Sequence, residues 1–236
     1  MTLSFEETTM NAKVGLVGIG RLGTALMNHW CKNRIKVGIY HPNQSKAERF
    51  VQRFSNGYIL TRNELDQLDY LILALSAKDI VPFISKLSSE SLMVSNLQFI
   101  NMATALQTKQ LKEQFPNYEI LGIKYMGHAK DLLDNGNGLF ISESKLPSEI
   151  EILFNYLGKI VIDSEEILNE VNRVATYYAI KASMEIDTIM TKKGLSSDYV
   201  ERALTSLAPY IMRSYYEGNL GHFAKDIVKE IQNGKQ

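Results

Sequence analysis

The sequence is poor in cysteine and has no surplus of charge of either sign. Cys31 is its only cysteine, which excludes an internal disulfide framework and a zinc site made of cysteines. Its 26 basic residues balance 26 acidic residues, so the formal net charge is zero. Nucleic acids and anionic membranes favour proteins with surplus positive charge. We therefore expect neither as the main partner of this chain.

Long apolar runs are also lacking. The longest stretch without a charged residue, 91–108, carries polar side chains along its whole length, and these are costly in hydrocarbon. Residues 1–10 contain Glu6 and Glu7 and lack the basic and apolar segments of a secretion signal, so we expect a frayed tail there. We expect a cytoplasmic protein without a membrane span.

Short apolar runs alternate with amphipathic stretches through the first 145 residues. The runs that indicate buried strands are 13–17, 36–40, 70–74, 99–102, 120–126 and 138–141. The stretches that indicate helices are 22–33, 44–54, 79–87 and 108–114. This alternation predicts an α/β fold, with a mostly parallel sheet and helices on both of its faces. A last helix at 149–157 and a strand at 159–162 are expected to close the sheet.

The pattern changes in the last third of the chain, where helical spacing replaces strands. Apolar residues keep this spacing over several turns, at Val171, Val174, Tyr178, Ala182, Ile186 and Ile189. Gly194 is expected to end that helix, and further helices at 199–215 and 223–231 follow. The chain is therefore expected to have an α/β domain at 11–162 and a small all-helical domain at 163–236.

One glycine motif carries most of the functional information. Gly18, Gly20 and Gly23 form G-x-G-x-x-G directly after the first expected strand and at the start of the first expected helix. In such a motif the first glycine makes a tight turn, the second lets the backbone approach a pyrophosphate, and the third allows close helix packing. The helix N-terminus adds N–H groups and partial positive charge. Further strand–helix units follow, which is the context that the motif requires.

The motif therefore predicts a Rossmann-type dinucleotide-binding domain. Its alternative interpretation is a glycine turn with a purely structural role. The residues expected to contact the cofactor here are Gly18, Ile19, Gly20, Arg21, Leu22 and Gly23.

The turn after the second expected strand indicates which dinucleotide is bound. An NAD site usually has Asp or Glu about 20 residues past the motif, to bind the ribose 2′-hydroxyl. Here the sequence has no carboxylate, and a 2′-phosphate can instead receive hydrogen bonds or positive charge from His41, Asn43, Ser45 and Lys46. We therefore expect NADP, with NAD less favoured. The same residues also fit a polar turn that caps a helix from Gln44, and both interpretations can hold together.

On these residues the sequence resembles pyrroline-5-carboxylate reductase and the wider group with deazaflavin-dependent NADP reductases and β-hydroxyacid dehydrogenases. The resemblance lies in the glycine loop at 13–25, the turn at 41–47 and the strand at 71–75. Residues 125–129, Tyr-Met-Gly-His-Ala, are similar to the family's Met-Pro-Asn segment beside the nicotinamide. Residues 192–195, Lys-Lys-Gly-Leu, are similar to the end of the family's first C-terminal helix.

The resemblance implies an NADP-dependent oxidoreductase that transfers a hydride to a small C=N or C=O substrate. Leu75 and Ser76 are further expected cofactor contacts, and Asn101 and Thr104, which flank the end of the fifth expected strand, would contact the nicotinamide or its ribose. No metal site is expected, because no two histidines or carboxylates have ligand spacing.

Two candidate catalytic residues are expected, Lys181 from the resemblance and His128 from its place after a strand. Lys181 lies on the first C-terminal helix, where β-hydroxyacid dehydrogenases carry a lysine that acts as acid or base. Its alternative is a solvated surface lysine. His128 follows a strand on the side where ligands bind, and it would donate a hydrogen bond to a substrate carbonyl or carboxylate. Its alternative is a loop histidine without a catalytic role.

The family's substrate-binding segments have no counterpart in this sequence. Its Ser-Gly-Pro-Ala loop falls at 173–178, which reads Arg-Val-Ala-Thr-Tyr-Tyr, and its Gly-Gly-Thr-Thr segment is missing. A second function is therefore open, in which a protein derived from this family binds NADP as a regulatory or redox-sensing part and catalyses no reaction.

The C-terminal helices carry more aromatic rings than such a small unit can bury alone. The rings belong to Tyr177, Tyr178, Tyr199, Tyr210, Tyr215, Tyr216 and Phe223. They would pack either on the nucleotide domain or against a second copy of the chain. The resemblance implies the second arrangement, a homodimer.

Overall fold

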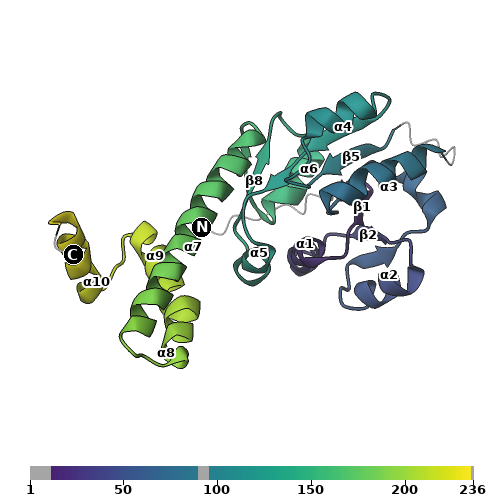
Figure 1. Cartoon of the computed structure of the whole chain (residues 1–236). Helices are drawn as coiled ribbons and strands as arrows, with labels where there is room; N and C mark the ends of the chain where they lie inside the picture. Colours follow the sequence, from purple (N-terminus) through teal and green to yellow (C-terminus); the bar gives the residue numbers. More distant parts are fainter. Residues whose placement is uncertain (1–11, 90–95, 235–236) are drawn as a thin grey trace, which may run out of the picture. The chain divides into compact units, whose positions relative to one another are not determined.

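The computed structural model describes residues 12–89 and 96–234. The expected tail at residues 1–10 and part of the uncharged stretch at 91–108 lie outside the described residues. The chain divides into two compact units, Met1–Val171 and Asn172–Gln236. The boundary falls inside one long helix, α7 (Glu166–Lys192), which runs from the first unit into the second (Figure 1).

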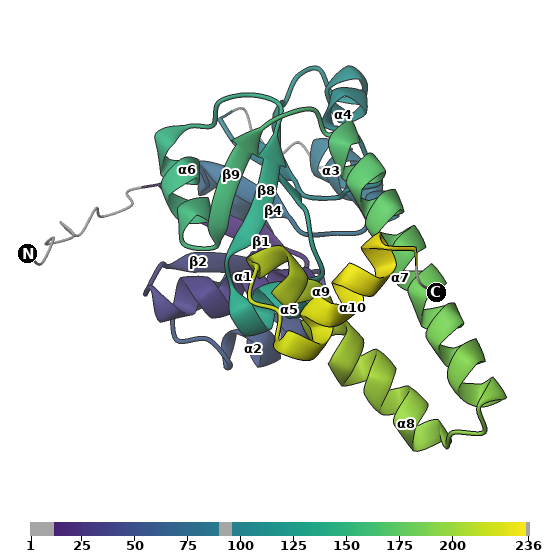
Figure 2. The same ribbon diagram turned by 90° about the vertical axis from the view of Figure 1, so that its left-hand side faces the viewer.

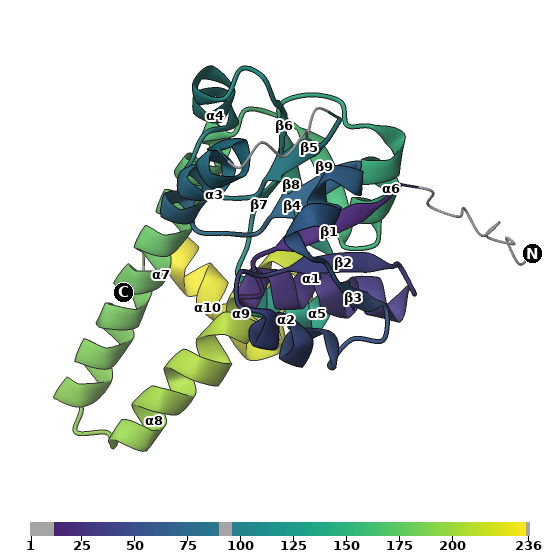
Figure 3. The same cartoon turned by 90° about the vertical axis from the view of Figure 1, so that its right-hand side faces the viewer.

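The first unit is built around a six-stranded parallel sheet with the strand order β3-β2-β1-β4-β5-β6. The strands are β1 Val14–Val17, β2 Val37–Tyr40, β3 Gly57–Ile59, β4 Tyr70–Leu73, β5 Gln98–Asn101 and β6 Glu119–Gly122. Figure 3 shows β4, β1 and β2 in this order across the sheet. The chain therefore winds outward from β1 in one direction and then from β4 in the other. This arrangement confirms the predicted mostly parallel sheet.

Helices cover both faces of this sheet, because alternate strand residues face two separate cores. Leu16 and Ile72 belong to one core, together with α1 (Arg21–Lys32) and α2 (Gln44–Val51). Val17 and Leu73 belong to the other core, with α3 (Ala77–Ser89) and α4 (Thr108–Gln114). The prediction of helices on both faces is thus confirmed.

A second, three-stranded sheet corrects the prediction for residues 120–126 and for the closing strand. The expected single strand is divided between β6 and β7 (Lys124–Tyr125), and β7 belongs to the separate sheet β7-β8-β9. In that sheet β8 (Gly138–Ser142) pairs antiparallel with β7 and parallel with β9 (Gly158–Ile162), as Figure 2 shows for β8 and β9. An apolar run cannot indicate where the chain leaves one sheet for another, so the two strands were predicted as one.

Three short elements of the first unit have no strong periodic signal and were not predicted. They are β3, a 3₁₀ helix at Arg62–Gln67 and α5 (Ala129–Asn135). The expected helix at 149–157 is α6 (Ser148–Asn155), and it connects β8 with β9.

The second unit consists of helices and turns in its described residues. After α7 come α8 (Ser197–Arg202), a π-helical turn (Ala203–Leu207), α9 (Ala208–Glu217) and α10 (His222–Gln232). Gly194 follows the end of α7 with a positive φ of 70°, as predicted. Figures 2 and 3 show α7 and α8 side by side, joined by this turn. Among the described helices, none is both long and apolar enough to cross a membrane.

Candidate functional site

The three glycines of the motif have different surroundings. Gly18 has a φ of 106°, and a Cβ atom there would lie 2.2 Å from the carbonyl oxygen of Ala74. A Cβ atom on Gly23 would lie 1.9 Å from the carbonyl oxygen of Gly18. At Gly20, in contrast, no atom lies within 4 Å of the Cβ position. Gly18 and Gly23 are therefore required by the packing itself, whereas Gly20 leaves open space beside the backbone for a ligand.

The N-terminus of α1 faces this open space without a cap from any side chain. Gly20 is the N-cap residue, and the first turn contains no acidic residue. The first helical bond runs from the Thr24 N–H to the Gly20 carbonyl at 2.9 Å, so the N–H groups of residues 21–23 have no partner within the helix. These groups and the helix dipole favour an anion. Arg21 is exposed in the same turn, and Ile19 and Leu22 pack against the core.

The predicted phosphate-binding turn lies at the carboxyl end of β2, the neighbour of β1. His41 Nδ1 lies 2.9 Å from the Asn43 backbone nitrogen and 3.1 Å from the Asn43 carbonyl oxygen, so this ring nitrogen is engaged within the turn while Nε2 is not. Asn43 Oδ1 accepts the Lys46 N–H at 3.0 Å and caps α2. The capping interpretation is therefore confirmed for Asn43. The side chains of Ser45 and Lys46 are exposed and free of this cap.

A cavity of about 400 Å³ lies at the carboxyl ends of β4 and β5. It is lined by Leu22, Ala74, Leu75, Ser76, Ala77, Met102, Ala103, Thr104, Ala105 and Tyr125. Leu22 belongs to the first turn of α1, so the cavity adjoins the glycine loop. Its position beside β1 and β4 is where the strand order reverses, which is the place where open α/β sheets bind ligands. The structure thus brings the predicted residues Leu22, Leu75, Ser76 and Thr104 to one cavity.

Two of the predicted cofactor-binding residues, Ser76 and Asn101, form side-chain hydrogen bonds with other residues of the chain. Ser76 donates its hydroxyl to the Asp79 carboxylate at the start of α3. Asn101 is fully buried: its Nδ2 donates to the Leu106 carbonyl at 2.8 Å and to Thr108 Oγ1 at 3.1 Å, and its Oδ1 accepts the Ala103 N–H at 3.1 Å. The polar atoms of the Asn101 side chain thus hold the following loop, and its contact with the cofactor stays a prediction.

Tyr125 is a cavity residue that the sequence analysis did not assign. Its ring packs on Phe140 at 5.4 Å between centroids, and its hydroxyl donates to the His128 carbonyl at 3.2 Å. Burial raises the pKa of Tyr125, and the charge of Asp131 acts in the same direction, so the phenol is neutral at neutral pH. Its place in the segment similar to the family's nicotinamide-binding motif was the available signal.

His128 itself is exposed and does not line this cavity. Its Nδ1 accepts the Lys130 N–H at 3.3 Å, so it serves as the N-cap of α5. That bond leaves Nε2 as the donor of a neutral ring.

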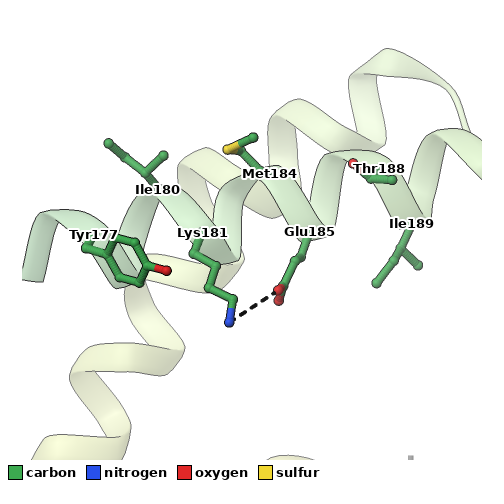
Figure 4. Close-up of a pocket in the computed structure, with 7 residues that line it drawn as sticks. All are labelled: Tyr177, Ile180, Lys181, Met184, Glu185, Thr188 and Ile189. Carbon is green, nitrogen blue, oxygen red and sulfur yellow. Dashed lines mark ion pairs between the residues drawn. The ribbon is translucent and has the colours of Figure 1, made fainter.

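Lys181 lies on α7 in the second unit, on the open face that Figure 4 shows. Its Nζ is 3.9 Å from Glu185 Oε1, and the two side chains are 53% and 61% exposed, so the pair is weak. The surrounding groove of about 480 Å³ is lined by Tyr177, Ile180, Lys181, Met184, Glu185, Thr188 and Ile189. All of these belong to α7, and one helix cannot enclose a ligand.

A buried ion pair beside the cavity was also missed. Lys124 is 1% exposed, and its Nζ donates to the carbonyls of Ala103 at 2.7 Å and Leu106 at 2.9 Å. The same nitrogen lies 3.6 Å from Glu165 Oε2. Burial lowers the pKa of Lys124 to about 8, against the opposing charge of Glu165. The one signal in the sequence was a lysine inside an apolar run, because a buried charge needs a partner.

Comparison with known proteins agrees with this arrangement. Residues 13–98 match the family described as NADP oxidoreductase, coenzyme F420-dependent. The structure is similar to a pyrroline-5-carboxylate reductase from Coxiella burnetii, with a TM-score of 0.67 and 11% identity over 93% of this chain and 84% of that chain. No curated protein sequence matches the chain.

Two further solved structures share the fold. An imine reductase variant from Myxococcus stipitatus in complex with NAD⁺ gives a TM-score of 0.60 and 13% identity, over 95% of this chain and 77% of that chain. A reductive aminase from Aspergillus terreus in complex with NADPH gives a TM-score of 0.62 and 14% identity, over 94% of this chain and 78% of that chain.

At these identities the similarity to solved structures establishes the fold alone. The family match at residues 13–98 includes the glycine loop, the strand β4 and the turn that follows β2. The expected resemblance to this group of oxidoreductases is confirmed. Residues 13–98 are thus similar to the F420-dependent NADP oxidoreductase family, and the chain has the fold found in pyrroline-5-carboxylate reductase and imine reductases.

Proposed function

We propose that the protein is an NADP-dependent reductase of the pyrroline-5-carboxylate reductase type, which transfers a hydride to a small C=N or C=O substrate. The observation that carries this proposal is the open space at Gly20, next to the uncapped N-terminus of α1 and the cavity at β4 and β5. The family match and the NADPH-bound reductive aminase support the same proposal.

The residues of the first unit have the chemistry to hold NADP. The N–H groups of Arg21 and Leu22 would bind the pyrophosphate beside Gly20. His41, Ser45 and Lys46 would bind the 2′-phosphate, since the turn offers donors and no carboxylate. The cavity lined by residues 74–77 and 102–105 would hold the nicotinamide end, and the bound cofactor would supply the hydride.

A carbonyl or imine also needs a proton when the hydride arrives. We propose two side chains as the proton donor. His128 has Nε2 as its donor, because Nδ1 is engaged at the start of α5. Lys181 is an exposed ammonium on α7, held only by its weak pair with Glu185. Either group would act as a general acid toward the substrate nitrogen or oxygen.

We also propose that the chain works as a homodimer. No described residue of the second unit, 172–234, is buried, so this unit has no core of its own. Each of the seven aromatic rings is more than 60% exposed, from Tyr177 at 61% to Tyr216 at 91%. A helical unit without buried side chains gains too little from the hydrophobic effect to be stable alone. A second copy would cover this surface and supply the missing wall of the groove at Lys181.

Calorimetric titration with NADPH and NADH tests the cofactor assignment. We expect NADPH to bind about tenfold or more tightly than NADH, because the donors of the turn after β2 pair with the 2′-phosphate. Binding of neither nucleotide would overturn the proposal, and tighter binding of NADH would overturn only the phosphate assignment.

A screen of cyclic imines, 2-keto acids and 3-hydroxy acids, followed by NADPH absorbance, tests the reaction. We expect turnover of at least one substrate, lowered about 100-fold or more in Lys181→Ala or His128→Ala with NADPH affinity unchanged. Binding of NADPH without any turnover would favour the regulatory alternative. The replacement of the family's Pro-Asn by Gly127-His128 is the observation on that side.

A further inference from the structure

Four buried polar side chains hold the loop between β5 and α4, which forms one wall of the cavity. These side chains, which we call the loop anchor, are Asn101, Thr108, Lys124 and Glu165, with exposures of 0%, 4%, 1% and 6%. They come from β5, the start of α4, β7 and the residue before α7. The chain thus gathers them from four separate places around a single loop.

Lys124 and Asn101 bind the carbonyl groups of this loop. The Lys124 ammonium donates to the carbonyls of Ala103 and Leu106, and the same nitrogen lies 3.6 Å from the carboxylate of Glu165. Asn101 donates to the same Leu106 carbonyl and accepts the Ala103 N–H. Both ends of the segment that lines the cavity are therefore tied to buried side chains.

Glu165, the residue before α7, completes the loop anchor by binding the start of α4. Its Oε2 accepts the Thr108 backbone N–H at 2.9 Å, and its Oε1 accepts the Thr108 hydroxyl at 2.6 Å. The N-cap residue of α4, Gln107, provides no side-chain cap, so this carboxylate replaces it. The fit is close, because a Cβ atom on Gly122 would lie 2.0 Å from Glu165 Oε1.

The polar character of the loop anchor is not explained by stability alone. A buried ion pair is often no more stabilising than a well-packed apolar pair of the same volume. An apolar pair, however, has no donors for the carbonyls of Ala103 and Leu106. Residues 103–105 have short side chains and line the cavity, so the course of their backbone, held by the bonds at Ala103 and Leu106, shapes this wall.

We propose that the loop anchor positions residues 102–106 against the nicotinamide end of NADP, so that this wall is formed before the cofactor binds. This inference rests on the proposed function. Lys124 and Glu165 are positioning residues in it, because they act through the loop. The adenosine end has its own supports, in the glycine loop and in the cap of α2.

A pair of ligands separates the two ends of the site. NADPH reaches both ends, whereas adenosine 2′,5′-bisphosphate has only the adenosine, the 2′-phosphate and one 5′-phosphate. In Lys124→Met we expect the Kd for NADPH to rise on the order of tenfold, since the loop must now be ordered by the cofactor. We expect the Kd for the bisphosphate to stay within about twofold of the wild-type value. Calorimetry measures both constants without any turnover.

The control variant is Asn56→Ala. Asn56 is also a buried polar side chain of the first unit, and its Nδ2 donates to the Ile35 carbonyl at 2.6 Å, at the amino ends of the strands. This change is expected to lower the unfolding midpoint without altering either Kd. It shows whether a general loss of stability can imitate the effect.

Two further variants keep the test decisive if Lys124→Met folds poorly. In Lys124→Met with Glu165→Gln no unpaired buried charge remains, so we expect the unfolding midpoint to recover in part while the weak NADPH binding persists. Thr108→Val removes only the hydroxyl bonds of the loop anchor and is expected to raise the NADPH Kd about threefold.

Equal weakening of both ligands, or no weakening of NADPH, in wild-type-like folded variants would overturn the role of the loop anchor. If the wild-type chain binds neither ligand, the proposed function itself fails, and the inference fails with it.

Discussion

The two units of this chain differ in how they deal with their apolar residues. The first unit buries them in two cores, one on each face of the parallel sheet. The second unit, in residues 172–234, leaves every described residue at least partly exposed, including large side chains such as Tyr216 and Phe223. The first unit therefore encloses two cores within one chain, whereas the second has no buried residue among those described. The nucleotide site should need one chain, and the groove at Lys181 should need two.

The largest expected effect tests the proposed dimer of the second unit. Tyr210→Asp combined with Phe223→Asp places two charges where rings that are 67% and 81% exposed would be buried in a dimer. Because buried aromatic anchors contribute about 2 kcal/mol or more each, we expect the dimer dissociation constant to rise at least about 100-fold. Analytical ultracentrifugation would show the monomer, and turnover would be lost while NADPH still binds.

Tyr156→Asp is the matched control, since Tyr156 is an exposed ring of the first unit, at 39%. It should change neither the mass nor the activity. A double variant that keeps the wild-type mass, or a wild-type chain that is monomeric at micromolar concentration, would contradict the proposed assembly.

A second prediction separates packing from binding within the first unit. Gly23→Ala forces a Cβ atom against the Gly18 carbonyl and should lower the free energy of unfolding by about 3 kcal/mol. Gly20→Ala meets no protein atom and should leave that free energy within about 0.5 kcal/mol of wild type. It should nevertheless weaken NADPH binding on the order of 100-fold, because the methyl group occupies the place of the pyrophosphate.

Chemical denaturation and calorimetry on the same two variants measure these quantities. The role of the glycine loop would be contradicted if Gly20→Ala bound NADPH as tightly as wild type does.

The smallest predicted effect concerns pH and the Lys124 ammonium, which faces the carboxylates of Glu165 and Glu143. Burial holds the pKa of Lys124 at about 8 in the folded state, against 10.5 when it is free. Between these values the unfolded chain binds more protons, so the free energy of unfolding should rise with pH. We expect wild type to gain about 1–2 kcal/mol relative to the variant Lys124→Met with Glu165→Gln from pH 8 to pH 10.

Urea denaturation of both proteins across this range measures the difference. Parallel pH profiles for the two proteins would show that Lys124 keeps an ordinary pKa in the folded state.

Sequence reasoning worked best where local backbone demands decide the structure. The G-x-G-x-x-G spacing is typical of a tight turn between a strand and the first turn of a helix. The loop at Gly18–Gly23 and the parallel sheet around it were therefore predictable. Leu75 and Ser76 were also found at the cavity, because strand ends of a parallel sheet share one edge.

Sequence reasoning worked less well where contacts between side chains of distant segments decide the structure. Asn101 stands at a strand end in the sequence, and nothing local shows that its amide is consumed by the next loop. Lys124 and Glu165 are 41 positions apart, and β7 and the turn before α7 become neighbours only in the folded unit. The short strand β3 has three residues, too few to give a periodic signal.

The sequence by itself determined the α/β fold, the glycine loop and the donors of the turn after β2, because periodicity and glycine geometry act over a few neighbouring residues. Tertiary structure alone decided that residues 120–126 divide between two sheets, that Asn101 turns inward, and that Lys124 meets Glu165 behind the cavity wall. Those outcomes depend on which buried polar atoms find partners across the fold, and such pairing is settled only when the whole unit packs.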